Sequence, residues 1–316
     1  MGATPFLEGF FPHAPAGFRG GCPPGGDDWE MMVSILYNLM KIIWKWPFFL
    51  LIFVKISFIM NKTAYWEGNC LGEIIAVLSG KGGTGKTSLC AGISVELARQ
   101  GKRVLCVDCD VGLRNLDISL GMSDCAGLSF LDVCQGGTPL EDAPRHPGFP
   151  ALRFLTAPMN CPVEQIDPED FAAFFRNSRE SFDYIFLDAP AGVDAMFRLA
   201  SGCADRIVLV TLPSPAAIRD ACRVGELLEL AGKRSVKLVV NRVDKGMLGS
   251  LRLTIDDVMD TAGLPLLGVV MEDSHVTLAA AFGRSLPEYA PRCAAARAFR
   301  RIANRLQGIP EPMKLR

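Results

Sequence analysis

A glycine-rich stretch at residues 80–87, with the sequence GKGGTGKT, fits the pattern GxxxxGK[ST]. Its glycines let backbone N–H groups turn inward and form a concave anion nest, and a helix that begins there adds partial positive charge. In such a loop Lys86 places an ammonium on the β- and γ-phosphates, and the Thr87 hydroxyl is a ligand for Mg²⁺. The stretch predicts a nucleoside triphosphate site whose contacts are Gly80, Lys81, Gly82, Gly83, Thr84, Gly85, Lys86, Thr87 and Ser88.

Three carboxylates follow aliphatic runs that are typical of buried strands. Asp108 and Asp110 come at the end of the run 102–108, and Asp188 closes the run 183–188. Ligands bind beyond the carboxyl ends of the strands in an open α/β sheet, so these acids are expected to face the loop and to serve Mg²⁺ and the attacking water. A hydrophobic strand that ends in Asp, as at Asp188, is the Walker B arrangement for Mg²⁺. The alternative for one of Asp108 and Asp110 is to cap a helix, a position that Asp favours.

The elements that must position these residues alternate along the chain. Several strands read as continuous aliphatic runs, the pattern of strands covered on both faces. Strands are predicted at 73–79, 102–108, 152–156, 183–188, 206–211, 236–241 and 266–271, and helices at 87–100, 168–180, 215–231, 254–262 and 293–307. This alternation predicts an α/β fold, a doubly wound and mainly parallel sheet with helices on both faces.

Composition excludes several classes of protein. Hydrophobic residues make up 49% of the 316 residues, which excludes a disordered chain. A formal net charge of −1 excludes a polycation that coats nucleic acid. Eleven cysteines are too sparse for a disulfide framework and indicate a reducing compartment. Cys106 and Cys109, the closest pair, are predicted to lie on opposite faces of the sheet rather than to form a redox motif.

The N-terminal part of the chain differs in composition from the rest. The predicted domain organisation is an extension at 1–59, a linker at 60–72, a P-loop ATPase domain at 73–307 and a tail at 308–316. Residues 1–30 are rich in Gly and Pro, and residues 31–60 are strongly apolar but interrupted by lysines. On a scale of free energies of membrane insertion, the gain from the apolar side chains of this stretch and the cost of its lysines nearly cancel. Three interpretations stay open for 1–59: an over-extended start, because Met60 would be a natural start, a membrane anchor, or a soluble partner-binding extension.

Lys81, directly after the first glycine, is not needed by an ordinary phosphate loop. The form KGGxGKT resembles the deviant Walker A motif of the MinD/ParA family of P-loop ATPases. The stretch DVGLRNLD at 110–117 and the stretch DAPAG at 188–192 resemble the two switch segments of that family, in its MinD-type members. The resemblance covers about residues 73–306.

The resemblance implies Mg²⁺-dependent hydrolysis of ATP to ADP and phosphate, in a homodimer that sandwiches ATP. Lys81 would reach the phosphates of the neighbouring subunit, Asp110 would position the hydrolytic water, and Asp108 would lie close to the Mg²⁺ shell. Asn241 and Arg242, at the end of the run 236–241, take the position from which the family contacts adenine. The next adenine-lining turn, 268–273, departs from the family because Met271 stands where proline is usual. The implied catalytic residues are Lys81, Lys86 and Asp110, and the implied metal ligands are Thr87, Asp108 and Asp188.

The role that the resemblance implies is placement of the division septum, with MinC-like and MinE- or DivIVA-like partners, in the cytoplasm and at the inner face of the cell membrane. The alternatives are a ParA-like partitioning ATPase that binds DNA nonspecifically and a flagellar or pilus positioning ATPase. An iron–sulfur carrier of the same fold is disfavoured, because the cysteines are scattered.

The segment 293–307 has one apolar and one arginine-rich face. It is predicted to be the last helix of the fold, and an interfacial membrane helix is the alternative. The tail holds Pro310 and Pro312, which argue against the family's usual terminal membrane helix.

Overall fold

The computed structural model describes residues 71–313, apart from 113, 126 and 160. The predicted extension at 1–59 and most of the predicted linker therefore lie outside the described residues. Among the residues that are described, no helix is both long and apolar enough to cross a membrane.

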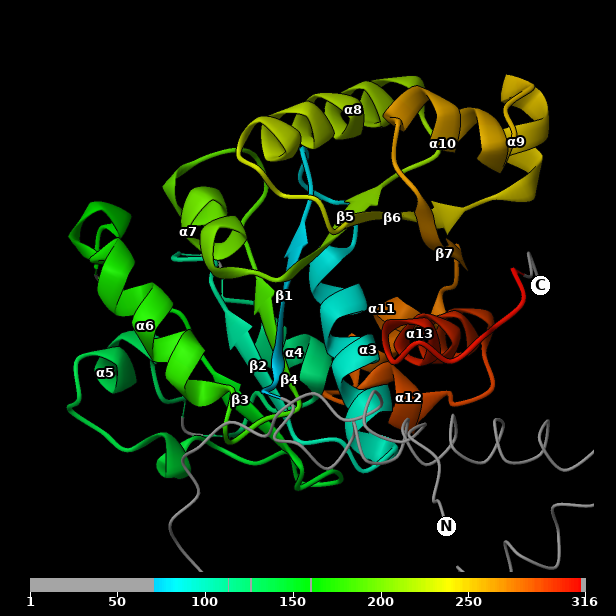
Figure 1. Cartoon of the computed structure of the whole chain (residues 1–316). Coiled ribbons are helices and arrows are strands. Elements are labelled where there is room, and N and C mark those ends of the chain that lie inside the picture. The colour runs from blue at the N-terminus through cyan, green and yellow to red at the C-terminus, as the bar shows by residue number, and fades with distance from the viewer. Residues whose placement is uncertain (1–70, 113, 126, 160, 314–316) are drawn as a thin grey trace, which may run out of the picture. The chain divides into compact units, whose positions relative to one another are not determined.

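Seven strands form one sheet in the order β3-β2-β4-β1-β5-β6-β7, and every pairing is parallel. Figure 1 shows the sheet at the centre of the domain, between helices. All seven predicted strands and the doubly wound fold are confirmed. The strands are β1 (Glu73–Leu78), β2 (Val104–Asp108), β3 (Leu152–Leu155), β4 (Tyr184–Asp188), β5 (Arg206–Thr211), β6 (Val236–Val243) and β7 (Leu266–Met271).

Helices cover both faces of the sheet and enclose two separate cores. One core contains residues of α5 (Phe130–Cys134), α6 (Pro168–Ser178), α7 (Ala195–Cys203), α8 (Pro215–Leu230) and α10 (Ile255–Ala262). The other contains residues of α3 (Lys86–Arg99), α4 (Leu116–Leu120), α11 (His275–Ala281), α12 (Leu286–Tyr289) and α13 (Ala294–Leu306). The remaining elements are α9 (Lys245–Leu251) and two short 3₁₀ turns, η1 (Leu140–Asp142) and η2 (Val163–Gln165).

Strand β1 illustrates why the aliphatic runs are continuous. Ile74 and Ala76 belong to one core, whereas Ile75 and Val77 belong to the other. Successive side chains of a strand point to opposite faces, so a strand that is covered on both faces needs apolar residues at every position. Cys106 and Cys109 likewise lie in different cores, as predicted.

Helix α13 packs against α3 and β7 (Figure 1). Its apolar face is buried, and the Phe299 ring lies so close to Gly92 that a Cβ there would be 2.1 Å from it. Two of its arginines are engaged within the chain: Arg300 pairs with the buried Glu96 at 3.4 Å, and Arg305 donates to the Leu267 carbonyl at 2.8 Å. The interpretation as the last helix of the fold is confirmed. The arginine-rich face is only partly exposed, because α3, β7 and the residues after α13 accept Arg300 and Arg305.

Replacing Phe299 with alanine should lower the free energy of unfolding by about 3–5 kcal/mol, because a buried aromatic ring leaves a cavity. Urea unfolding of the full chain measures it. Phe282→Ala is the matched control: that ring is 64% exposed and stacks on Tyr289, so its loss should cost about 1 kcal/mol or less. Equal stability of the unaltered chain and Phe299→Ala would contradict the docking of α13.

Candidate nucleotide site

The glycine-rich loop joins the carboxyl end of β1 to the first residue of α3, Lys86, as the motif predicts. Strand β1 lies between β4 and β5, so the loop emerges in the middle of the sheet. Gly85 caps α3 with φ at 83°, and a Cβ at that position would lie 2.4 Å from Nδ2 of Asn241. Both the left-handed backbone and the close approach require glycine there.

The end of β6 holds the backbone of this loop. Asn241 is buried and donates from Nδ2 to the Thr84 carbonyl at 2.7 Å. Arg242 donates to the Gly83 carbonyl at 3.3 Å and pairs with Glu272 at 2.8 Å. The sequence singled out Asn241 and Arg242 as adenine contacts. The structure adds that both side chains contact the loop itself, and the adenine contact stays a prediction.

Replacing Asn241 with alanine should cost about 1–3 kcal/mol of stability, because it removes the donor to a carbonyl inside the protein. Thermal or urea unfolding measures the change. Arg242→Ala removes a neighbouring contact that is exposed to solvent, and it should cost about 1 kcal/mol or less. If the two variants lost equal stability, the Asn241 contact would not be the one that anchors the loop.

Asp108 and Asp188 lie side by side, because β2 and β4 pair them in register. Both are buried. Burial, and then the neighbouring Asp108, raise the pKa of Asp188 to about 7, although the Thr87 hydroxyl and Lys86 oppose the rise. Burial raises the pKa of Asp108 to about 6, against hydrogen bonds from backbone N–H groups.

Such a pair fits a divalent cation. Asp188 Oδ1 is buried and has no hydrogen-bond partner among the described residues. Carboxylate and hydroxyl oxygens are the ligands that Mg²⁺ prefers, and a dication would offset the two desolvated charges. Thr87 lies near, since its side chain acts to lower the pKa of Asp188. Of the three predicted ligands, Thr87 and Asp108 therefore both neighbour Asp188.

Asp108 is not the N-cap residue that the sequence left as an alternative, since Asn115 takes that position in α4, but its carboxylate does bond to the start of this helix. Its Oδ2 accepts from the N–H groups of Asn115 and Leu116, both at 3.2 Å, at the start of α4. Its Oδ1 accepts from the N–H of Asp110 at 2.9 Å. Asp108 thus fixes the backbone of the loop 109–115, and Asp110 is the half-buried acid that this loop carries.

The two lysines of the loop have different surroundings. Lys86 is 8% exposed, and burial lowers its pKa, against the attraction of Asp188 and then Asp110. Lys81 is exposed. Ser79, which the motif does not include, donates to the Lys81 carbonyl at 2.7 Å. The Ser79 carbonyl accepts from Gly192 at 3.1 Å, so the segment DAPAG runs beside the loop. The sequence analysis missed Ser79, and its position directly before the motif is the signal that could have identified it.

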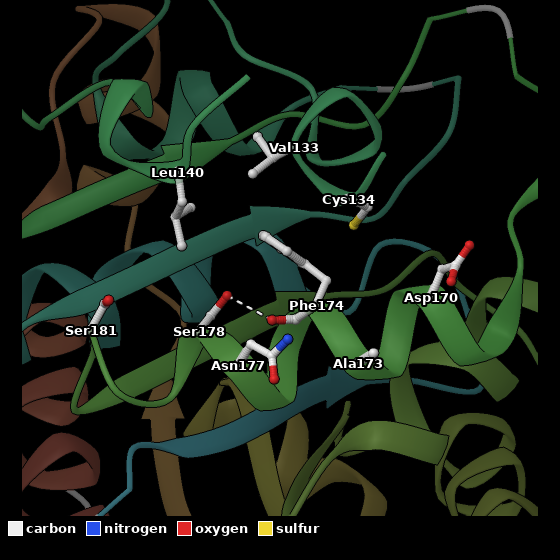
Figure 2. Close-up of a pocket in the computed structure, with 9 residues that line it drawn as sticks. All are labelled: Val133, Cys134, Leu140, Asp170, Ala173, Phe174, Asn177, Ser178 and Ser181. Carbon is white, nitrogen blue, oxygen red and sulfur yellow. Dashed lines mark hydrogen bonds between the residues drawn. The ribbon is translucent and has the colours of Figure 1, made fainter. Parts of the chain in front are cut away.

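The two acids of the turn after β7 make different contacts. Glu272 faces the loop through Arg242, whereas Asp273 accepts from the N–H of Ala295, near the start of α13. A cavity in the described part of the chain lies elsewhere. It measures about 400 Å³ and lies between α5, η1 and α6, with Phe174 at its centre (Figure 2). None of the predicted site residues lines it, so it is not the nucleotide site.

Comparison with known proteins agrees with this geometry. Residues 75–286 match the family model described as "CobQ/CobB/MinD/ParA nucleotide binding domain". The chain is 35% identical over 244 residues to the septum site-determining protein MinD of Synechocystis, which covers 77% of this chain and 92% of that protein.

Two solved structures are similar as well. The first is the MinC:MinD complex of Aquifex aeolicus, with a TM-score of 0.71 and 34% identity over 77% of this chain and 98% of that one. The second is the MinD of Pyrococcus horikoshii complexed with Mg-ADP, with a TM-score of 0.66 and 30% identity over 75% and 96% of the two chains. The chain therefore belongs to the MinD/ParA family of P-loop ATPases, and it is a MinD-like member of that family.

Proposed function

We propose that this chain is a Mg-ATP-dependent dimerisation switch that acts in placement of the division septum. Hydrolysis of ATP to ADP and phosphate would separate two protomers and so end each period of partner binding. The observation that carries the proposal is the loop itself, in which one lysine is buried beside the acids and a second is exposed. One ammonium thus serves the protomer's own nucleotide, and the other is available to a neighbour.

Each residue has a proposed role at the phosphates. Lys86 and the N–H groups of 80–88 bind and orient the β- and γ-phosphates at the start of α3. Thr87, Asp108 and Asp188 would hold Mg²⁺, which neutralises the charge that develops on the phosphate oxygens. Asp110 would orient the water whose oxygen bonds to the γ-phosphorus while the bond to the β–γ bridging oxygen breaks. Asn241 and Arg242 would contact adenine in addition to holding the loop.

Lys81 provides the direct test of the switch. Lys81→Ala should still bind Mg-ATP, because Lys86 and the backbone nest are intact, but it should remain a monomer with ATP. Light scattering of the unaltered chain and the variant, each with ATP and then with ADP, measures this. A dimer of Lys81→Ala with ATP would overturn the role in trans, as would an unaltered chain that does not dimerise.

One relative supports a partner for this chain. A MinD protein forms a complex with MinC in Aquifex aeolicus, and we propose a MinC-like partner here, together with a MinE- or DivIVA-like regulator at the inner face of the membrane. Liposome co-sedimentation with ATP and with ADP tests the membrane contact. ATP-dependent retardation of DNA would favour the ParA-like alternative instead. Its support in the sequence was the arginine face of α13, where Arg300 and Arg305 already have partners within the chain.

A further inference from the structure

Three metal-ligating side chains meet outside the nucleotide site. Asp273 follows β7, His275 is the first residue of α11, and Cys293 is the cap of α13. One ligand atom from each of them lies within 4.8 Å of those of the other two. A carboxylate, an imidazole and a thiol from two separate segments thus share one position at the surface.

Backbone groups hold two of these ligands in place. Asp273 Oδ2 accepts from the N–H of Ala295 at 3.0 Å, and Cys293 Sγ accepts from the N–H of Ala296 at 3.3 Å. Asp273 Oδ1 lies 2.6 Å from Nδ1 of His275. Hydrogen bonds of this kind orient metal ligands. In the metal-free protein, burial and then the neighbouring Asp273 raise the pKa of the Cys293 thiol, although the backbone N–H groups at the start of α13 oppose the rise, so the bound cation itself would have to favour the thiolate.

We propose that Asp273, His275 and Cys293 form a binding site for Zn²⁺ or a similar transition-metal ion, with water as the fourth ligand. Thiolate and imidazole select such ions over Mg²⁺, so this site is chemically distinct from the one at the phosphates. One thiolate and one carboxylate balance the charge of the dication, and the Cys293 proton leaves to solvent as the sulfur–metal bond forms.

The required movement is small. Tetrahedral zinc with bonds of about 2.0–2.3 Å places its ligand atoms about 3.3–3.6 Å apart. The 2.6 Å between Asp273 Oδ1 and His275 Nδ1 would therefore widen by less than about 1 Å, and the Cys293 sulfur already lies within 4.8 Å of both. The Asp273 side chain is only 8% exposed, but that of His275 is 49% exposed, so an ion can enter from solvent on the side of His275.

The bound ion would tie the turn after β7 to the start of α13. Glu272, the residue before Asp273, pairs with Arg242, which contacts the glycine-rich loop. The site therefore lies one residue from a contact of the nucleotide loop, and metal binding should raise the melting temperature of the domain.

The test uses the full chain, freed of metal, saturated with Mg-ADP and then titrated with Co²⁺. Thiolate ligation gives a sulfur-to-cobalt charge-transfer band in the near ultraviolet, which oxygen ligands of Mg²⁺ sites do not give. One equivalent of Co²⁺ should produce the band, and Zn²⁺ should abolish it by displacing the Co²⁺.

Cys293→Ser should lose the band and weaken Zn²⁺ binding by more than about 100-fold. Loss of a residue that only hydrogen-bonds to a metal ligand typically lowers metal affinity 10–100-fold, and loss of the ligand itself should lower it more.

Serine suits this variant because it is itself a good helix cap, so α13 should stay docked and the unfolding of the metal-free protein should be unchanged. Cys161→Ser, a change at a half-exposed cysteine, is the matched control and should keep the band. His275→Gln should weaken Zn²⁺ binding without removing the sulfur–cobalt band. Absence of the band in the unaltered chain, or its persistence in Cys293→Ser, would overturn the proposal.

Discussion

Lys86→Ala should abolish ATP binding at ordinary nucleotide concentrations. The Lys86 ammonium is buried at the start of α3, where the negative charges of Asp188 and Asp110 attract it. The charge-assisted bonds that we propose from Lys86 to two phosphates would be worth about 3–6 kcal/mol together, so the dissociation constant should rise roughly 100-fold or more. Titration with a fluorescent ATP analogue measures it.

The control for this change is the second lysine of the same loop. Lys81→Ala also removes a positive charge from the glycine-rich stretch, but at an exposed position. It should therefore leave the affinity of the monomer for ATP within a few fold of the unaltered chain. Normal ATP affinity of Lys86→Ala would contradict the assignment of the loop as the phosphate site.

Asp110→Ala should separate binding from hydrolysis. The loop, Thr87, Asp108 and Asp188 remain, so ATP binding and dimerisation should be kept. Because we propose that Asp110 orients the attacking water, its loss should slow phosphate release about 100-fold or more. Phosphate release under saturating ATP measures the rate, and light scattering confirms the dimer.

Asp117→Ala is a suitable companion to that variant, because Asp117 is an acid of the same segment whose Oδ1 accepts from the N–H of Ile118, in the first turn of α4. It should hydrolyse ATP at close to the normal rate. A normal rate in Asp110→Ala, or an equal loss in both variants, would mean that the first switch segment has been assigned incorrectly.

Much of the fold was predictable because the strands and long helices carry local signals. The strands covered on both faces are unbroken aliphatic runs, and helices such as α8 begin with Pro and show clear periodicity. The sequence missed α4, α5, α7, α9, α11 and α12, all of nine residues or fewer. A helix of one or two turns has too few residues to display a period, and tertiary contacts determine whether it forms.

Some features of the candidate site could likewise be predicted from local sequence patterns, and others could not. The loop and the three acids were predictable, because each sits in a short pattern whose chemistry needs consecutive residues. The contact between Asn241 and Thr84 was not, because it joins residues 157 positions apart. The cluster of Asp273, His275 and Cys293 was equally hidden, since only the docking of α13 beside β7 brings the cysteine to the other two.

The docking of α13 on α3 has a consequence for how the protein is made. Helix α3 begins at the phosphate loop, yet the face that bears Gly92 and Glu96 is covered by α13, more than 190 residues later in synthesis. During translation this face stays open to water after all seven strands have emerged. The growing chain thus carries an uncovered apolar surface, the kind that chaperones recognise, until α13 has been synthesised.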